Sequence, residues 1–379
     1  MKRSNIVFLI VILLLYFFKY LISSYIPFGE YFYLLPMIIY VLFNVFRRYL
    51  NKITLYLLFF NLNFISLYII SLFRNVDLII ASTALLNYTL TLNFWVFYLN
   101  NNILNFKNIN KYIYIFLGII SLGAIIQYFI DAKIFGLIND SIYSDEKNLQ
   151  KSVFTKRAIS IIKSPQTLGF VIAIFILYSK NKLLMVINYI AAILTFTKAF
   201  FLSIFLDYLL RFKIKYIGVF IFLFIFFSFL VYRFQEFDGI NRLYYFMYEF
   251  EVGSQADRLD RWKYYINMFD SLDKFVFGNG LGIASRANGI LGANSLVYSS
   301  ESFLIQIFTE AGLLGVLLFI VPFIFLFLSD KNQRVKIFVF FSLLMISPAF
   351  YGFSVSFLLY PLILIPFFLN FKKVSALER

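Results

Sequence analysis

The chain has 379 residues, of which 62% are hydrophobic and only 14% are charged, and its formal net charge is +15. Apolar runs of about 20 residues, long enough to cross a hydrocarbon core as helices, recur throughout, so a soluble globular domain is excluded. The chain contains no cysteine and no histidine, which excludes disulfides, thiolate catalysis and an imidazole general base. Carboxylates and cations must therefore carry any chemistry.

The apolar runs predict an all-α polytopic membrane protein, with a single integral membrane domain over residues 1–379. We expect about 12 transmembrane helices. They lie near residues 5–22, 29–46, 53–73, 77–99, 111–130, 164–179, 183–197, 198–211, 215–232, 302–328, 335–350 and 353–370. The seventh and eighth are short and joined almost without a loop, so a re-entrant or broken pair is an alternative.

The positions of the cations predict the topology. They gather in alternate short loops and in the tail, at Arg47-Arg48, Lys180/Lys182, Arg211/Lys213/Lys215, Lys331/Arg334/Lys336 and Lys372-Lys373. The positive-inside rule places these loops and both termini in the cytoplasm. About 18 of the 34 basic residues and 3 of the 19 acids then lie inside, leaving about 16 of each elsewhere. The positive excess is therefore a topology signal: the lipid bilayer is a partner, and nucleic acid is not.

Two long outer loops are predicted, at residues 131–163 and 233–300. The second is rich in aromatic residues, which supply apolar area for packing, and so predicts a small extracytoplasmic helical cap before the tenth helix. Within it, Ser254 and Asp257 have the spacing that opens a helix, and apolar residues recur at helical intervals as far as Phe269.

Several cations in the outer loops depart from the positive-inside pattern. Arg258 and Arg261 are three residues apart on the predicted cap helix, so their guanidinium groups point toward a shared space and suit phosphate oxygens. Lys156 and Arg157 precede the sixth span, and Lys198 lies in the turn after the seventh. The two arginines could instead pair with Asp257, Asp260 or lipid headgroups, and the other cations could be anchors to lipid headgroups.

Two further motifs lie near the tenth span. The run Gly278-Asn-Gly280-Leu-Gly282 allows tight turns and close backbone approach to a ligand or to another helix, and a plain turn is its simplest interpretation. Glu301 is predicted at the outer mouth of the span, and Glu310 lies nine residues, or roughly 13 Å, deeper. An acid inside a membrane helix is costly, which makes it a functional candidate.

Small and aromatic residues surround these motifs. Gly312 and Gly315 are interpreted as positions of close helix packing. Six tyrosines of this region could stack on sugar rings, although packing is favoured for most of them. They are Tyr244, Tyr245, Tyr248, Tyr264, Tyr265 and Tyr298.

The ordered set of motifs resembles the superfamily of O-antigen polymerases (Wzy) and O-antigen ligases. The set comprises Arg157 with Ser-Pro-Gln, the Thr-Lys turn at Lys198, the Arg258-x-x-Arg261-Trp helix, the glycine run, and the segment from Glu301 to Gly315. The resemblance covers most of residues 150–320. It implies an inverting, metal-independent glycosyltransferase of the bacterial inner membrane, with no cofactor and with its active site facing the periplasm.

The resemblance also implies partners and roles. The donor and the acceptor would both be oligosaccharide repeat units linked to undecaprenyl pyrophosphate, and a chain-length regulator would be a further membrane partner. Glu301 would be the catalytic base. Arg157, Lys198, Arg258 and Arg261 would bind the leaving pyrophosphate. Secondary candidates are Lys156, Gly278, Gly280, Gly282, Glu310 and Tyr265.

Two departures from the family and two rival classes bear on this hypothesis. The ligases carry a histidine where Glu301 stands, which favours a polymerase over a ligase. The family commonly has arginine where Lys198 stands, and a lysine still neutralises phosphate but lacks the bidentate fork of arginine. A lipid-linked sugar flippase or other transporter would be expected to show repeated halves and charges at mid-membrane depth. A non-catalytic scaffold would tolerate loss of the paired arginines.

Overall fold

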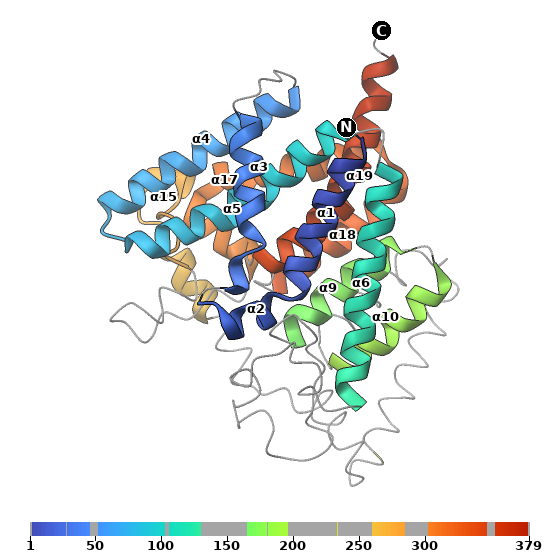
Figure 1. The fold of residues 1–379 in the computed structure, drawn as a ribbon. Helices are drawn as coiled ribbons and strands as arrows, with labels where there is room; N and C mark the ends of the chain where they lie inside the picture. Colours follow the sequence, from blue (N-terminus) through green and yellow to red (C-terminus); the bar gives the residue numbers. More distant parts are fainter. Residues whose placement is uncertain are drawn as a thin grey trace.

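The protein is represented by a computed structural model, which describes residues 2–27, 29–45, 52–102, 106–129, 165–179, 181–195, 233, 260–284, 302–346 and 353–377. All regular structure within these residues is helical, which confirms the predicted class for this part of the chain (Figure 1). The longer helices are α1 (Lys2–Phe17), α3 (Leu34–Val45), α4 (Lys52–Phe73), α5 (Leu78–Asn101), α6 (Phe106–Phe129), α9 (Pro165–Tyr178), α10 (Lys182–Thr195), α17 (Phe303–Ser329), α18 (Lys331–Ile346) and α19 (Phe353–Leu377).

Outside the cap, the described helices overlap the predicted spans in sequence, and the largest differences lie near the N-terminus. The first span is broken at Phe18 (φ −90°, ψ 11°), so that α1 is followed by a separate short helix, α2 (Lys19–Tyr25). The second predicted span begins with a 3₁₀ turn, Gly29–Tyr31, and its α-helix starts only at Leu34. The predicted spans at 198–211 and 215–232 and the first outer loop lie outside the described residues.

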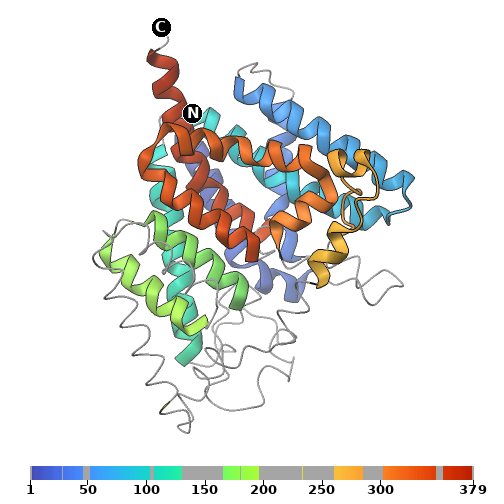
Figure 2. The same cartoon turned by 180° about the vertical axis from the view of Figure 1, so that it is seen from behind.

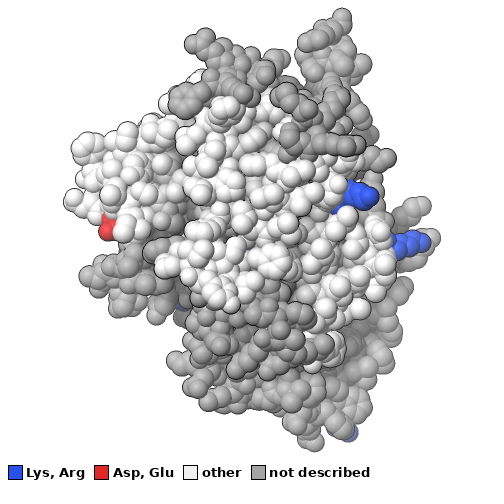
Figure 3. Space-filling view, in the orientation of Figure 1, with Lys and Arg blue, Asp and Glu red and all other residues white. Residues whose placement is uncertain are grey.

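Several described helices have the length and composition of membrane helices. Four of them can cross a bilayer on those grounds, within Leu55–Phe73, Leu78–Asn101, Asn108–Phe129 and Phe303–Ser329. Large apolar side chains of α4, including Leu58, Leu62 and Ile69, point outward and are about half exposed. Figure 3 shows a face with few charged groups among the described residues. Such a surface would be unfavourable in water and suits lipid, so the apolar helices indicate a membrane protein.

Helix α5 lies at the centre of one group of helices and packs against α3, α4 and α19. Its Trp95 is buried and donates its indole N–H to the carbonyl of Phe357 in α19, at 2.8 Å. One turn away, the hydroxyls of Thr91 and Ser356 lie 2.9 Å apart. Because a membrane interior offers no water to buried polar groups, these bonds fix how the two helices pair.

A second group consists of α6, α9 and α10. The buried Ser121 hydroxyl of α6 donates to the Asn188 side chain of α10 at 2.6 Å, and the Tyr114 hydroxyl donates to the carbonyl of Tyr178 at 2.7 Å. The start of α1 and the end of α19 lie at the same end of the molecule (Figures 1 and 2). The turn between α4 and α5 lies away from those ends, beside the short helix α15 (Leu272–Phe277).

Helix α17 is kinked in its N-terminal half. It begins after Ser302, whose hydroxyl accepts a hydrogen bond from the backbone N–H of Ile305 and so caps the helix. Gly312 has non-helical torsion angles (φ 64°, ψ −168°), so α17 consists of two segments joined at a kink. The first segment contains Glu310, and the kink positions it against the residues that follow α15.

Candidate functional site

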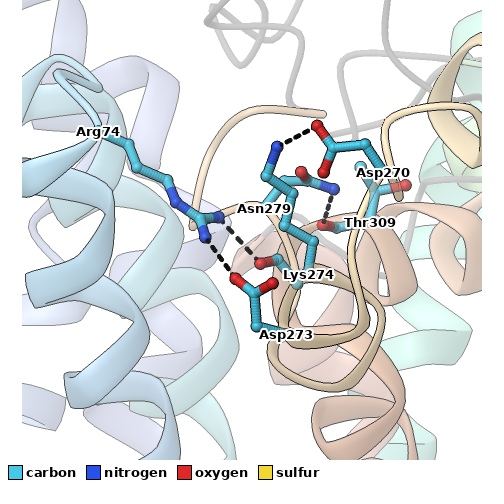
Figure 4. Close-up of polar contacts among 7 residues, drawn as sticks. Arg74, Asp270, Asp273, Lys274, Asn279 and Thr309 are labelled. Atoms are coloured by element: carbon cyan, nitrogen blue, oxygen red, sulfur yellow. Dashed lines mark hydrogen bonds and ion pairs between the residues drawn. The ribbon is translucent and has the colours of Figure 1, made fainter.

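The turn between α4 and α5 presents Arg74 toward the cap. Helix α4 ends because Asn75 adopts a left-handed conformation (φ 58°), and the backbone N–H of Val76 then bonds back to the carbonyl of Ser71. Asp77 starts α5 by accepting the backbone N–H groups of the next helical turn. These local signals make a tight connection, which leaves the Arg74 side chain free to reach across to the residues after α15 (Figure 4).

The described part of the predicted cap is residues 260–284. It is helical over 260–266, turns, and continues into α15, which packs against α17. The ring of Phe308 on α17 lies 4.6 Å from Phe269 and 5.5 Å from Phe275, measured between ring centroids. The cap helix therefore ends at residue 266, before the Phe269 to which the apolar spacing extended. Phe269 lies after the helix and packs against Phe308.

Two ion pairs lie on this part of the cap, one within it and one between it and Arg74 (Figure 4). Lys274 Nζ lies 2.7 Å from Asp270, and this hydrogen bond holds the pKa of Asp270 below its usual range. Arg74 Nη2 lies 3.7 Å from Asp273. The pKa of Asp273 is also lowered, first by a hydrogen bond from Ser271 and to a smaller extent by Arg74. The two exposed carboxylates, Asp270 and Asp273, are therefore compensated by the ammonium group of Lys274 and the guanidinium group of Arg74.

The residues that follow α15, 278–284, are here named the glycine segment. Gly278, Gly280 and Gly282 all have positive φ angles, which side chains disfavour. The backbone N–H of Asn279 donates to the carbonyl of Thr309 at 2.8 Å, and that of Gly280 donates to the carbonyl of Glu310 at 3.1 Å. An unbroken helix would use these carbonyls for its own amides four residues later. Because of the kink, the carbonyls of Thr309 and Glu310 are available to other donors. The backbone N–H groups of Asn279 and Gly280 bond to them instead of amides of α17.

The other side of the glycine segment contacts α4 and α5. The backbone N–H of Leu281 donates to Ser71 Oγ at 2.6 Å, and Arg74 Nη1 donates to the carbonyl of Gly278 at 3.0 Å. A Cβ atom at Gly282 would meet the side chain of Ile80 at 2.6 Å. The glycine segment is thus wedged between the α4–α5 turn and the kink of α17.

Glu310 is fully buried beside the glycine segment. Its Oε1 accepts hydrogen bonds from the backbone N–H of Ala284 at 3.2 Å and from the side-chain amide of Gln306 at 3.3 Å. Tyr88 and the backbone of Gly282 also approach the carboxyl group, while Oε2 has no hydrogen bond of ordinary geometry within the described part of the chain. The carboxyl group therefore ties the end of the glycine segment to the first turns of α17.

Tyr265 connects the cap helix to this arrangement. Its ring is buried and lies edge-on to Tyr264, with the ring centroids 5.4 Å apart. Burial raises the pKa of Tyr265, and the nearby negative charge of Glu310 adds to this, whereas Arg261 acts in the opposite direction. Tyr265 is therefore packed in the interior in this structure, and Arg261 lies one helical turn before it.

Of the predicted site residues that it describes, the structure brings the three glycines of the run together with Glu310, which also acts electrostatically on Tyr265. Arg261 lies one helical turn before Tyr265. The remaining candidates lie outside the described residues, namely Lys156, Arg157, Lys198, Arg258 and Glu301. Glu301 directly precedes Ser302, the cap of α17. Sequence reasoning missed Arg74, although it too is a cation in a loop predicted to be outside.

Comparison with known proteins gives no relative: no protein-family model matches the chain, and neither a curated protein nor a solved structure matches it.

Proposed function

We propose that this protein is a bacterial surface polysaccharide (O-antigen) polymerase of the inner membrane. The observation that supports the proposal best is that the glycine segment of the cap is hydrogen-bonded to Thr309 and Glu310 in the first segment of α17, about 30 residues later in the chain. These are two of the motifs on which the resemblance to the polymerase and ligase superfamily rests. Their contact brings the cap beside the start of α17, as a site shared by the cap arginines and Glu301 would require.

The proposal includes the topology of the whole chain. It has about 12 transmembrane helices, with both termini in the cytoplasm and the cap of residues 233–300 in the periplasm. Two observations support it. The start of α1 and the end of α19 lie at one end of the molecule, as an even number of crossings requires (Figure 1). The α4–α5 turn, predicted to be outside, contacts the cap.

The reaction is the transfer of a glycan from one lipid-linked unit to another. A hydroxyl oxygen of the acceptor attacks the anomeric carbon of the donor, a new glycosidic bond forms with inversion, and the bond to the pyrophosphate oxygen breaks. The hydroxyl proton passes to the carboxylate of Glu301, and undecaprenyl pyrophosphate leaves with the electron pair. Arg157, Lys198, Arg258 and Arg261 stabilise the negative charge that grows on this leaving group.

The test uses purified protein in lipid nanodiscs with synthetic undecaprenyl-pyrophosphate repeat units. We expect the wild-type protein to produce a ladder of lengthened lipid-linked glycan, and Glu301→Gln and Arg258→Ala to lose nearly all elongation. Unimpaired elongation by Glu301→Gln would remove Glu301 as the base. The matched control is Lys263→Ala, which removes an exposed cation of the cap helix that is paired with Asp260.

The same assay separates the rival functions. A ligase would transfer glycan only after addition of a lipid A core or another non-polyprenyl acceptor. A flippase would move labelled lipid-linked units across the bilayer without changing their length. A ladder formed from repeat units alone, in detergent as well as in nanodiscs, would exclude both, because transport needs two compartments and ligation needs the second acceptor.

A further inference from the structure

We propose that Glu310 is a positioning residue that fixes the cap helix relative to the start of α17. The inference rests on the proposed function, in which Arg261 of the cap and Glu301 before α17 act on one substrate. It adds to that function a structural role for Glu310, in which this residue does not contact the substrate. Three features of the structure support it: the hydrogen bonds of the glycine segment, the kink in α17 and the burial of the carboxyl group.

The backbone amides of the glycine segment are used within the protein. A phosphate-binding loop directs several free N–H groups at the anion. Here five N–H groups of the segment donate to protein acceptors at hydrogen-bonding distance. They run from Gly278 to the carbonyl of Lys274, from Asn279 to Thr309, from Gly280 and Ala284 to Glu310, and from Leu281 to Ser71. The glycine segment therefore joins helices together and does not form a phosphate cradle.

Glu310 contributes to this junction through both its backbone and its side chain. Its carbonyl, released by the kink at Gly312, accepts the N–H of Gly280. Its Oε1 accepts the N–H of Ala284 at the far end of the segment. The same oxygen accepts the side-chain amide of Gln306, one turn earlier in α17. One residue thus holds both ends of the glycine segment to the first part of α17.

The environment of the carboxyl group argues against direct chemistry at Glu310. The side chain is fully buried, so no sugar hydroxyl can reach it in this arrangement. None of the ion pairs between described residues includes it. What the carboxyl group does contact is the cap: its Oε1 accepts the backbone N–H of Ala284, and it also acts electrostatically on Tyr265, which belongs to the helix that carries Arg261. Because the glycine segment continues from the cap helix and α15, a shift of this segment would displace the cap relative to the start of α17.

Glu310→Gln and Glu310→Ala distinguish this role from acid–base chemistry. The glutamine keeps an oxygen that can accept both hydrogen bonds, whereas the alanine removes the acceptor. We expect Glu310→Gln to elongate glycan at nearly the wild-type rate, and Glu310→Ala to lose about 100-fold in kcat, because a small displacement of a catalytic group is that costly. The pH profile of Glu310→Gln should match that of the wild-type protein, since no proton is exchanged at this position.

Hydrogen exchange of the peptide containing residues 279–284 gives a readout that is independent of activity. We expect slow exchange in the wild-type protein and in Glu310→Gln, and fast exchange in Glu310→Ala. The control for general loss of a buried hydrogen bond is Asn188→Ala, which removes the bond to Ser121 between α6 and α10. It should lower thermal stability while leaving the exchange of residues 279–284 and the elongation rate unchanged.

Three results would overturn the inference: an inactive Glu310→Gln that retains slow exchange, a Glu310→Ala whose exchange is unchanged, or fast exchange in the wild-type protein. If the wild-type protein does not elongate glycan at all, the proposed function fails. The exchange pattern then still decides whether Glu310 holds the glycine segment, so the two failures are distinguishable.

Discussion

Gly278 and Gly312 face each other where the glycine segment crosses the kink of α17. A Cβ atom on Gly278 would collide with the backbone of Glu310 and Ala311, and a Cβ atom on Gly312 would collide with the backbone of Val276 and Gly278. Both glycines also have positive φ angles, of 83° and 64°. The two backbones can approach this closely only because neither residue has a side chain.

Gly278→Ala and Gly312→Ala should each destabilise the protein strongly. The left-handed conformation alone costs an ordinary residue about 1–2 kcal/mol, and the collision with rigid backbone adds to it. Thermal unfolding in nanodiscs measures the loss. The control is Gly118→Ala in α6, whose added Cβ would meet only a methyl group of Leu184. An equal loss in Gly118→Ala would show that any glycine replacement has this effect.

Ser71→Ala should destabilise the protein by about 1–3 kcal/mol, the usual cost of a buried donor without a partner. The Ser71 hydroxyl accepts the backbone N–H of Leu281 at 2.6 Å and is buried, so its removal strands that amide. Ser66 is the matched control, because its hydroxyl bonds only to the carbonyl of Leu62 within α4. We expect Ser66→Ala to unfold at nearly the wild-type temperature. Equal unfolding temperatures of the two variants would show that the contact between Ser71 and the glycine segment does not stabilise the protein.

Arg74 should matter more to stability than its ion-pair partner. Asp273→Asn removes an exposed pair with a separation of 3.7 Å, which is worth less than about 1 kcal/mol. Arg74→Ala removes in addition the hydrogen bond to the carbonyl of Gly278, and its loss should be about 1 kcal/mol greater. Unfolding curves at low and high salt separate the two, because only the ion pair is screened. Identical losses in both variants would assign the whole effect to the ion pair.

The positions of the helices were predictable because their signals are local. Long apolar runs mark α4, α5 and α17, and polar residues such as Asp77 and Ser302 cap the helices where those runs begin. The break at Phe18 was not predictable in this way, because no glycine or proline marks it and the single charged residue Lys19 is compatible with a continuous helix. Tertiary packing decides such breaks, and a single sequence does not show it.

The candidate site was predictable only in part, for a related reason. The spacing of Gly278, Gly280 and Gly282 indicated a close approach, but the partner of that approach is the kink of α17, about 30 residues later in the chain. Gly312 was interpreted as a packing residue, which agrees with its close contacts, but nothing in its neighbourhood signals a kink. Arg74 could have been found by the criterion applied to the other outer cations.

Arg261→Ala should reduce glycan elongation by about 100-fold or more, the usual loss when one group that stabilises transition-state charge is removed. Arg261→Lys should retain part of the activity, because an ammonium group still neutralises phosphate but lacks the bidentate fork. Lys263→Ala provides the control on the same helix, since Lys263 is exposed and pairs with Asp260 at 3.6 Å. Initial rates at saturating donor measure the effect. If Lys263→Ala lost as much activity as Arg261→Ala, the cap would act through its total charge, and the specific position of Arg261, one helical turn before Tyr265, would have no catalytic meaning.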